Sequence, residues 1–174
     1  MSNPPLSVVV GLGANLGPRR RTLQSAVTAL RAISVAGTSF RVSSLFETEP
    51  IGPAQPMFLN AAALFTVALQ PLELLDRLQA IEHHHGRVRD IPWGPRTLDL
   101  DLLWIEGVAV QHSRLRVPHP ELSGRAFALL PLLEVQPNAL TPDGRSLAPS
   151  AGFLPPGGIT RIDGPAWGMV SPGV

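Results

Sequence analysis

The sequence predicts an α+β fold with a ferredoxin-like β-α-β-β-α-β core, in which helices flank an antiparallel sheet and a hairpin and a helix are added at the C-terminal end. The first observation behind this fold is the order of the segments, because strand-like runs alternate with two stretches of helical periodicity. The second is composition. With 44% apolar and 16% charged residues over 174 positions, the chain can bury one ordinary core.

The first half of the chain supplies a strand, a helix and two further strands. Residues 7–12 form a short apolar run, and residues 18–33 carry apolar side chains on one helical stripe. Residues 38–46 alternate as a strand does, and residues 58–69 form a longer strand. Between these two strands, three prolines and a glycine keep residues 47–56 out of regular structure.

The second half completes the core and adds to it. A helix is predicted over 71–85, opened by a proline and followed by a glycine, then a strand over 98–105 that turns back into 108–112. A last helix is predicted over 125–135, which Pro131 should shorten or kink.

Beyond this helix, proline and glycine become dense. We expect residues 1–147 to form a single domain and residues 148–174 a loosely ordered tail. The chain has no cysteine, which excludes disulfides and thiolate metal sites. It also lacks a secretion signal and an apolar run of roughly 20 residues, so we expect a cytoplasmic protein without a membrane span.

All 14 basic residues are arginine, and lysine is absent. A phosphate-binding P-loop and lysine Schiff-base chemistry are therefore excluded. Any phosphate must be bound by guanidinium groups, which contact its oxygens in pairs.

Asp99 and Asp101 are the main candidates for chemistry. They lie two residues apart in a predicted strand, so both point to one face while Leu98, Leu100 and Leu102 point into the core. Adjacent carboxylates repel each other unless a cation lies between them, and such oxygen ligands suit Mg²⁺ held against a phosphate. Three arginines and Trp93 lie within residues 87–96 just before the pair, which indicates an electrostatic clamp for phosphate transfer.

Three other motifs have competing interpretations. The Gly-rich run 11–17 resembles a dinucleotide-binding fingerprint, but its third glycine is one position late; we expect a strand-to-helix turn in which Asn15 caps the helix. Three consecutive histidines, 83–85, point about 100° apart on a helix and cannot converge on one metal ion. His119 stands between two prolines, where either a phosphate or proton-transfer role or no role is open.

Taken together, several strings resemble the 6-hydroxymethyl-7,8-dihydropterin pyrophosphokinase family of folate biosynthesis. They are GANLG (13–17), FETEP (46–50), FLN (58–60), GRVR (86–89), WGPRTLDLD (93–101) and VPHP (117–120). The resemblance runs from about Val8 to Asp143. It implies transfer of the β,γ-diphosphate of ATP to the hydroxymethyl group of the pterin, with release of AMP.

The resemblance also implies roles for residues of this chain. Asp99 and Asp101 would hold two Mg²⁺ ions and, with Arg87 and Arg96, form the catalytic set. The ATP contacts would be Gln79, Glu82, Arg87, Arg89, Trp93, Arg96, Arg114 and His119. The pterin contacts would be Thr48, Glu49, Ile51, Phe58, Asn60, Trp93, Asp99, Arg125 and Phe127, with Phe58 and Phe127 sandwiching the flat ring.

Two alternatives belong to other classes. An RNA-binding module can have the same strand and helix order, but it would display aromatic residues on its central strands where this chain has acidic ones. A catalytically silent nucleotide-binding protein could use the same ligands. Under the enzyme reading, the partners are the small molecules ATP and the pterin, with no nucleic acid and no membrane, and the protein is a monomer.

Overall fold

The structure is a computed structural model, and it describes residues 3–50, 52–86, 97–149 and 158–169. Its elements, in chain order, are β1 (Leu6–Ala14), α1 (Arg19–Ile33), β2 (Arg41–Val42), β3 (Leu45–Thr48), β4 (Phe58–Val67), α2 (Pro71–His84), β5 (Asp99–Ile105), β6 (Val110–His112), β7 (Leu115–Val117), η1 (Leu122–Gly124), α3 (Ala126–Val135), β8 (Ile159–Asp163) and η2 (Pro165–Gly168).

The central sheet has the strand order β5-β1-β4-β3-β8, and β2 also pairs with β4. Every pairing in it is antiparallel. The strand that follows α1 is separated from β1 by β4, which is the split β-α-β arrangement of the ferredoxin-like fold. The predicted fold class is therefore confirmed.

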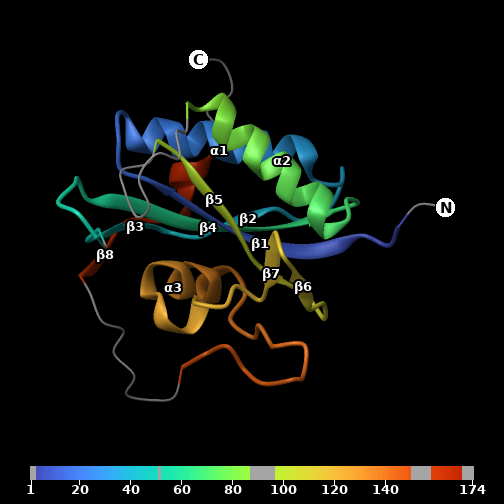
Figure 1. Cartoon of the computed structure of the whole chain (residues 1–174). Helices are drawn as coiled ribbons and strands as arrows, with labels where there is room; N and C mark the ends of the chain where they lie inside the picture. Colours follow the sequence, from blue (N-terminus) through green and yellow to red (C-terminus); the bar gives the residue numbers. More distant parts are fainter. Residues whose placement is uncertain (1–2, 51, 87–96, 150–157, 170–174) are drawn as a thin grey trace.

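The sheet is covered on both faces (Figure 1). On the face of α1 and α2, buried apolar side chains from alternate strand positions pack against Leu23, Leu30, Leu74 and Leu78. On the face of α3, Leu129, Leu132 and Val135 pack against Val9 and Ala62. Each fully buried Leu or Val contributes roughly 1.5–3 kcal/mol to folding, so the two faces together fix the sheet. None of the helices in the described ranges is long and apolar enough to cross a membrane.

The helix boundaries follow the sequence signals closely. Pro71 opens α2, and Gly86 follows its last turn with φ of 77°, a left-handed conformation that glycine adopts without strain. In α3, Pro131 was expected to shorten or kink the helix, but the helix continues through it to Val135. Leu129, Leu132 and Val135 bury their side chains against the sheet, and this packing outweighs the backbone hydrogen bond that proline cannot donate.

The strand predicted over 38–46 is interrupted at Ser43 and Ser44, both fully buried. The Ser43 hydroxyl accepts a hydrogen bond from the Ala62 N–H at 2.9 Å, where a regular ladder would use a carbonyl. The hydroxyl and N–H of Ser44 both donate to the Glu134 carboxylate of α3. Side-chain hydrogen bonding of this kind competes with the ladder, which explains the break.

The C-terminal part differs most from expectation. The predicted strand at 108–112 is shorter, and it pairs with an unpredicted strand, β7, in a separate hairpin sheet. The expectation of a loosely ordered tail is wrong for residues 158–169, because β8 pairs with β3 and η2 places Trp167 in the core at 3% exposure. The Trp167 indole N–H donates to the Ser43 carbonyl at 2.8 Å.

Candidate active site

Asp99 and Asp101 lie at alternate positions of β5, each partly exposed. Leu98, Leu100 and Leu102 belong to the core on the side of α1 and α2, so the two aspartates point to the opposite face. Both lie opposite glycines of β1: Asp99 faces Gly13 and Asp101 faces Gly11. The neighbouring strand therefore puts no side chain between the carboxylates and the space above the sheet.

Asp99 and Gly13 begin a row of cross-strand neighbours that continues with polar side chains on β4 and β3. Gly13 lies opposite Asn60 of β4. The Asn60 amide nitrogen donates to the Thr48 hydroxyl at 2.6 Å, and both side chains are buried. A Cβ atom on Gly13 would lie 2.7 Å from the Asn60 Oδ1 atom, so glycine is what lets this amide oxygen occupy the space beside Asp99. A carboxylate, an amide and a hydroxyl therefore lie on one face of the sheet.

Two further pterin candidates lie at the end of this row. Phe58 begins β4 opposite Thr48, and its ring is partly exposed. Glu49 is exposed, and its N–H donates to the Gly158 carbonyl at 3.1 Å. Gly158, directly before β8, therefore lies next to Glu49, one of the predicted substrate residues.

Asn15 fastens the loop that leads into β4, a role that the sequence did not indicate. Its side-chain nitrogen donates to the Gln55 Oε1 atom at 2.8 Å and to the Pro56 carbonyl at 3.0 Å. The expectation that Asn15 caps α1 is wrong, because no side chain caps that helix. Arg19 reinforces the same loop by donating to the Met57 carbonyl at 2.7 Å.

His119 and Arg125 approach the aspartates from the side of α3. The His119 N–H donates to the Leu103 carbonyl at 2.9 Å, which ties this segment to β5. Burial, and then the Arg125 guanidinium, lower the pKa of His119 from 6.5, while Glu121 and Asp99 act in the opposite direction. Arg125 also forms an ion pair with Glu121.

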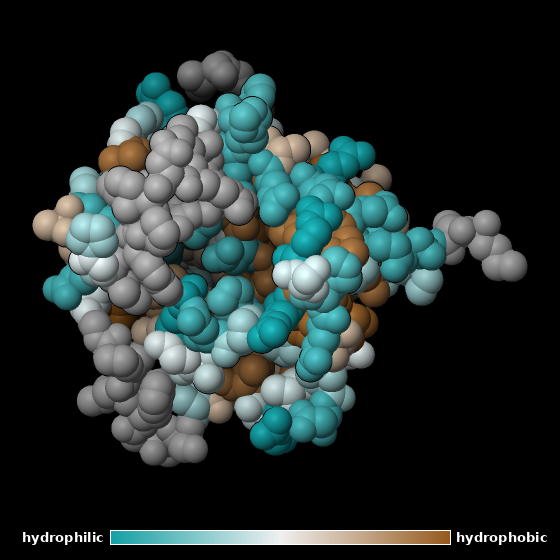
Figure 2. Space-filling model, viewed as in Figure 1, coloured by the Kyte–Doolittle hydropathy of each residue, from teal (hydrophilic) through white to brown (hydrophobic). Residues whose placement is uncertain are grey.

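Phe127 lies on the first turn of α3 and is partly exposed. The Arg125 guanidinium lies 5.8 Å from the centre of its ring. In the space-filling view, polar side chains gather in the middle of this face of the molecule (Figure 2). An aromatic ring, a cation and the aspartate pair thus lie on the same side of the sheet.

The remaining described candidates lie on α2 and the β6–β7 hairpin. Gln79 and Glu82 are one helical turn apart, and Glu82 is buried at 2% exposure. Arg114 of the hairpin forms an exposed ion pair with Asp76 of α2, with 2.6 Å between the guanidinium nitrogen and the carboxylate oxygen. Five predicted site residues, Ile51, Arg87, Arg89, Trp93 and Arg96, lie outside the described residues.

The donor set fits a magnesium ion brought by a nucleotide. Within the described ranges no group of three or more histidine, cysteine or acidic side chains could hold a metal ion. Mg²⁺ is usually bound through one or two carboxylates together with phosphate oxygens and waters. Two neighbouring, partly exposed aspartates match that pattern.

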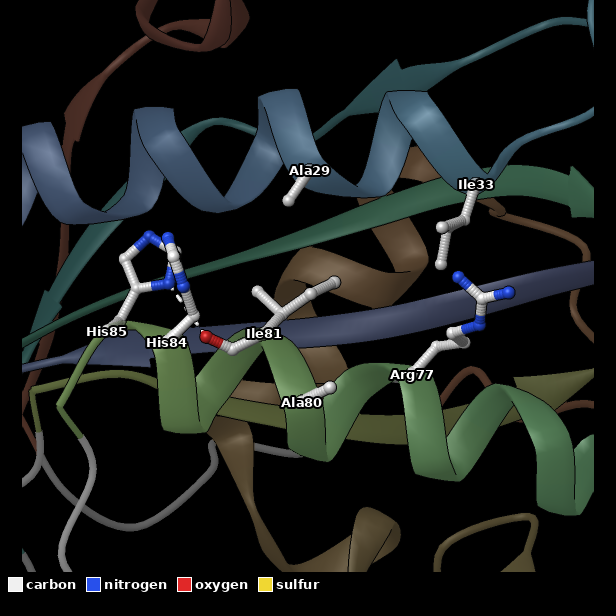
Figure 3. A pocket seen from close by; sticks show the side chains of 7 residues that line it. All are labelled: Ala29, Ile33, Arg77, Ala80, Ile81, His84 and His85. Carbon is white, nitrogen blue, oxygen red and sulfur yellow. Dashed lines mark hydrogen bonds between the residues drawn. The ribbon is translucent and has the colours of Figure 1, made fainter.

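A hollow of about 290 Å³ lies between α1 and α2, and the aspartate pair is not among the residues that line it (Figure 3). Residues from both helices line it: Ala29, Ile33, Arg77, Ala80, Ile81, His84 and His85. Both ring nitrogens of His85 have partners there, the Ile81 carbonyl at 2.7 Å and the Ser25 hydroxyl at 2.9 Å. The contact with Ser25 of α1 joins the two helices.

Comparison with known proteins adds a family match. The family model described as 7,8-dihydro-6-hydroxymethylpterin-pyrophosphokinase matches residues 9–137. A protein of Pseudomonas aeruginosa named 2-amino-4-hydroxy-6-hydroxymethyldihydropteridine pyrophosphokinase is 44% identical over 158 residues, covering 90% of this chain and 97% of that protein. A Bacillus subtilis protein of the same name is 42% identical over 127 residues, covering 72% of this chain and 75% of that protein.

Solved structures share the fold at low sequence identity. A crystal structure titled HPPK-DHPS in complex with substrates has a TM-score of 0.64 at 13% identity and covers 83% of this chain. Wild-type HPPK-DHPS of Plasmodium falciparum with SDX-DHP has a TM-score of 0.62, also at 13% identity and 83% coverage. This chain spans less than half the length of those solved chains, 42% and 43%.

Proposed function

This chain belongs to the 7,8-dihydro-6-hydroxymethylpterin-pyrophosphokinase family, and from that membership we propose that Asp99 and Asp101 hold the Mg²⁺ of its reaction. The protein is an ATP-dependent enzyme of folate biosynthesis that transfers the pyrophosphoryl group to hydroxymethyldihydropterin. The alternatives of an RNA-binding module and a silent nucleotide-binding protein are not favoured.

The reaction joins the hydroxymethyl oxygen of the pterin to the β-phosphorus of ATP. The bond between the β-phosphorus and the oxygen bridging to the α-phosphate breaks, and AMP leaves. Because the protein forms no covalent bond in such a transfer, its residues act by positioning the reactants and neutralising charge. When bound, two Mg²⁺ ions would neutralise and orient the phosphate oxygens.

The observation that carries this proposal is that Asp99 and Asp101 are partly exposed on one face of β5, each opposite a glycine. Carboxylates so placed can take part in binding metal while phosphate oxygens complete the coordination. His119 and Arg125 lie on the same side, and we assign His119 to the phosphates and Arg125 to the pterin hydroxymethyl group.

Arginines supply the remaining positive charge. We assign Arg87 and Arg96 to the transferred group, and Arg89 and Arg114 to the other phosphates, because guanidinium groups bind phosphate oxygens in pairs. Arg114 forms an ion pair with Asp76 in the structure, and it would have to leave Asp76 to bind ATP. Breaking this pair costs little free energy because both side chains are exposed. Gln79 and Trp93 complete the nucleotide contacts in this proposal.

We place the pterin over the row formed by Asn60 and Thr48. Phe58 and Phe127 would stack on its two faces, since flat rings gain both burial and favourable ring contacts in such a slot. Glu49, Ile51 and Trp93 would close its edges. The enzyme is proposed to act as a monomer in the cytoplasm.

The test is to measure AMP formed from ATP and hydroxymethyldihydropterin in the presence of Mg²⁺. Asp99→Asn and Asp101→Asn should each abolish turnover while leaving the circular dichroism spectrum unchanged. Glu106→Gln, a substitution at the exposed position directly after β5, is the matched control and should keep full activity. Near-normal turnover in both aspartate variants would show that the pair does not hold the metal.

A further inference from the structure

Glu82 is a buried carboxylate that contacts the backbone of the strand carrying the aspartates. It lies on α2 with 2% exposure. Its Oε2 atom accepts a hydrogen bond from the Leu100 N–H at 2.9 Å, in a buried environment. A buried carboxylate is costly unless it is hydrogen-bonded, so this contact is a specific feature of the packing between α2 and β5.

Leu100 is the residue between the two aspartates. In the described sheet β5 lies at one edge, with β1 as its only strand neighbour there. Leu100 pairs with Leu12 of β1, while its N–H is directed to Glu82 instead of to a further strand. Because Leu100 is 4% exposed, water cannot easily replace this acceptor.

The contact constrains the geometry of the metal site. Asp99 and Asp101 point to the same face only while the residue between them keeps its extended backbone, and a slip of one position would turn both away. The pairing with β1 holds one edge of this stretch of β5, and the Leu100 hydrogen bond to Glu82 holds the other edge between the two carboxylates.

We infer that Glu82 is a positioning residue that sets Asp99 and Asp101 for Mg²⁺ through the Leu100 backbone. This inference rests on the proposed function of the aspartates. It differs from the nucleotide contact that the sequence resemblance implies, because the Glu82 carboxylate accepts a hydrogen bond from the backbone of β5. It also differs from a metal-ligand role, since no three-residue acidic group forms in the described part of the chain.

The inference predicts a graded effect on the magnesium dependence of turnover. Replacing a group that orients metal ligands typically costs about 10–100-fold in metal affinity or activity. Glu82→Leu should therefore raise the Mg²⁺ concentration for half-maximal rate by about tenfold or more. Glu82→Gln keeps an acceptor for the Leu100 N–H, so its increase should be clearly smaller. Pterin affinity without metal should stay unchanged in both variants.

Glu73→Gln is the matched control, because it makes the same substitution at an exposed position of the same helix. It should leave the magnesium dependence unchanged. A merely structural role for Glu82 would lower the unfolding midpoint of Glu82→Leu without changing the half-saturating Mg²⁺ concentration, and that result would overturn the inference. Equal effects of Glu82→Gln and Glu82→Leu would also overturn it, because they would indicate a direct contact of the charge with a ligand.

Hydrogen exchange of the wild-type protein provides a measurement that does not depend on variant folding. The Leu100 amide should be protected to about the same degree as the ladder amides of β1, and exchange as fast as that of an exposed amide would contradict the inference. Failure of the proposed function can be distinguished from failure of this inference. Active Asp99→Asn and Asp101→Asn enzymes would refute the metal role of the aspartates. Inactive aspartate variants together with an unchanged magnesium dependence in Glu82→Leu would refute only the inference.

Discussion

Gly13 of β1 lies directly opposite Asp99 of β5, and the absence of a side chain at Gly13 leaves room for the amide of Asn60. Gly13→Ala should raise the dissociation constant of the pterin by at least about tenfold, since a Cβ atom 2.7 Å from the Asn60 Oδ1 atom forces this side chain to move. Fluorescence titration with the pterin measures the effect.

Gly124→Ala is the control for that experiment, because a Cβ atom there has no neighbour within 4 Å. It should leave pterin affinity unchanged. An unaltered dissociation constant in Gly13→Ala would mean that the Asn60 amide does not contact the pterin.

The hydrogen bond between Asn60 and Thr48 predicts a loss of stability in Thr48→Val. Valine keeps the shape of threonine but leaves the buried Asn60 amide without its acceptor, which costs about 1–3 kcal/mol. Urea denaturation measures this change, and Thr48→Ser should restore most of the stability because it keeps the hydroxyl. Equal stability of the valine and serine variants would exclude the hydrogen bond as the cause.

Asn15→Ala should raise the KM for the pterin with a smaller effect on the KM for ATP. The substitution releases the Gln55 side chain and the Pro56 carbonyl, which hold the loop before Phe58 and Asn60. Steady-state kinetics with each substrate varied in turn measures the two constants. Gln55→Ala removes only one of the two acceptors and should give an intermediate value; equal changes in both KM values would argue against a role confined to this loop.

The lowered pKa of His119 predicts how stability depends on pH in the protein without nucleotide or metal. Burial, then Arg125, lowers this pKa below 6.5, so between the folded and unfolded pKa values the unfolded chain binds more protons. Stability should therefore fall as pH drops from about 6.5 to the folded pKa, and His119→Gln should show a flatter profile in that window. Urea denaturation across the window and NMR titration of the imidazole measure both quantities; an imidazole midpoint above 6.5 would refute the prediction.

Trp167→Ala should lower the free energy of unfolding by about 3–5 kcal/mol, as deletion of a buried tryptophan does. Trp167 is 3% exposed and donates a hydrogen bond to the Ser43 carbonyl. Met169→Ala, at a position with 70% exposure, should stay within about 0.5 kcal/mol of the wild type. Guanidinium denaturation compares the two, and similar small changes would show that the segment adds no stability.

The sequence predicts the core of the fold because periodicity and composition act locally there. The stripe of Leu23, Val27 and Leu30 and the alternation around Asp99 and Asp101 each specify a burial pattern within a few residues. These patterns place the aspartates on β5 without knowledge of the other strands.

The sequence does not predict features that depend on distant partners. Asn15 resembles a helix cap in its local sequence. It instead holds a loop, because its side chain donates hydrogen bonds to residues 55 and 56, which are distant in sequence. The break at Ser43 and Ser44 depends on Glu134, 90 positions away. The order of residues 158–169 comes from main-chain pairing of β8 with β3 and from one buried tryptophan, Trp167. Neither contact requires apolar periodicity, so the sequence gives no local signal of it.

The pairing of β8 with β3 joins residues 45–48 to residues 159–163, across more than a hundred intervening positions. During synthesis β3 therefore emerges from the ribosome long before β8. Until β8 pairs with it, β3 exposes unsatisfied N–H and C=O groups to other nascent chains. This edge of the sheet is completed last, so truncated translation products should aggregate more readily than finished molecules.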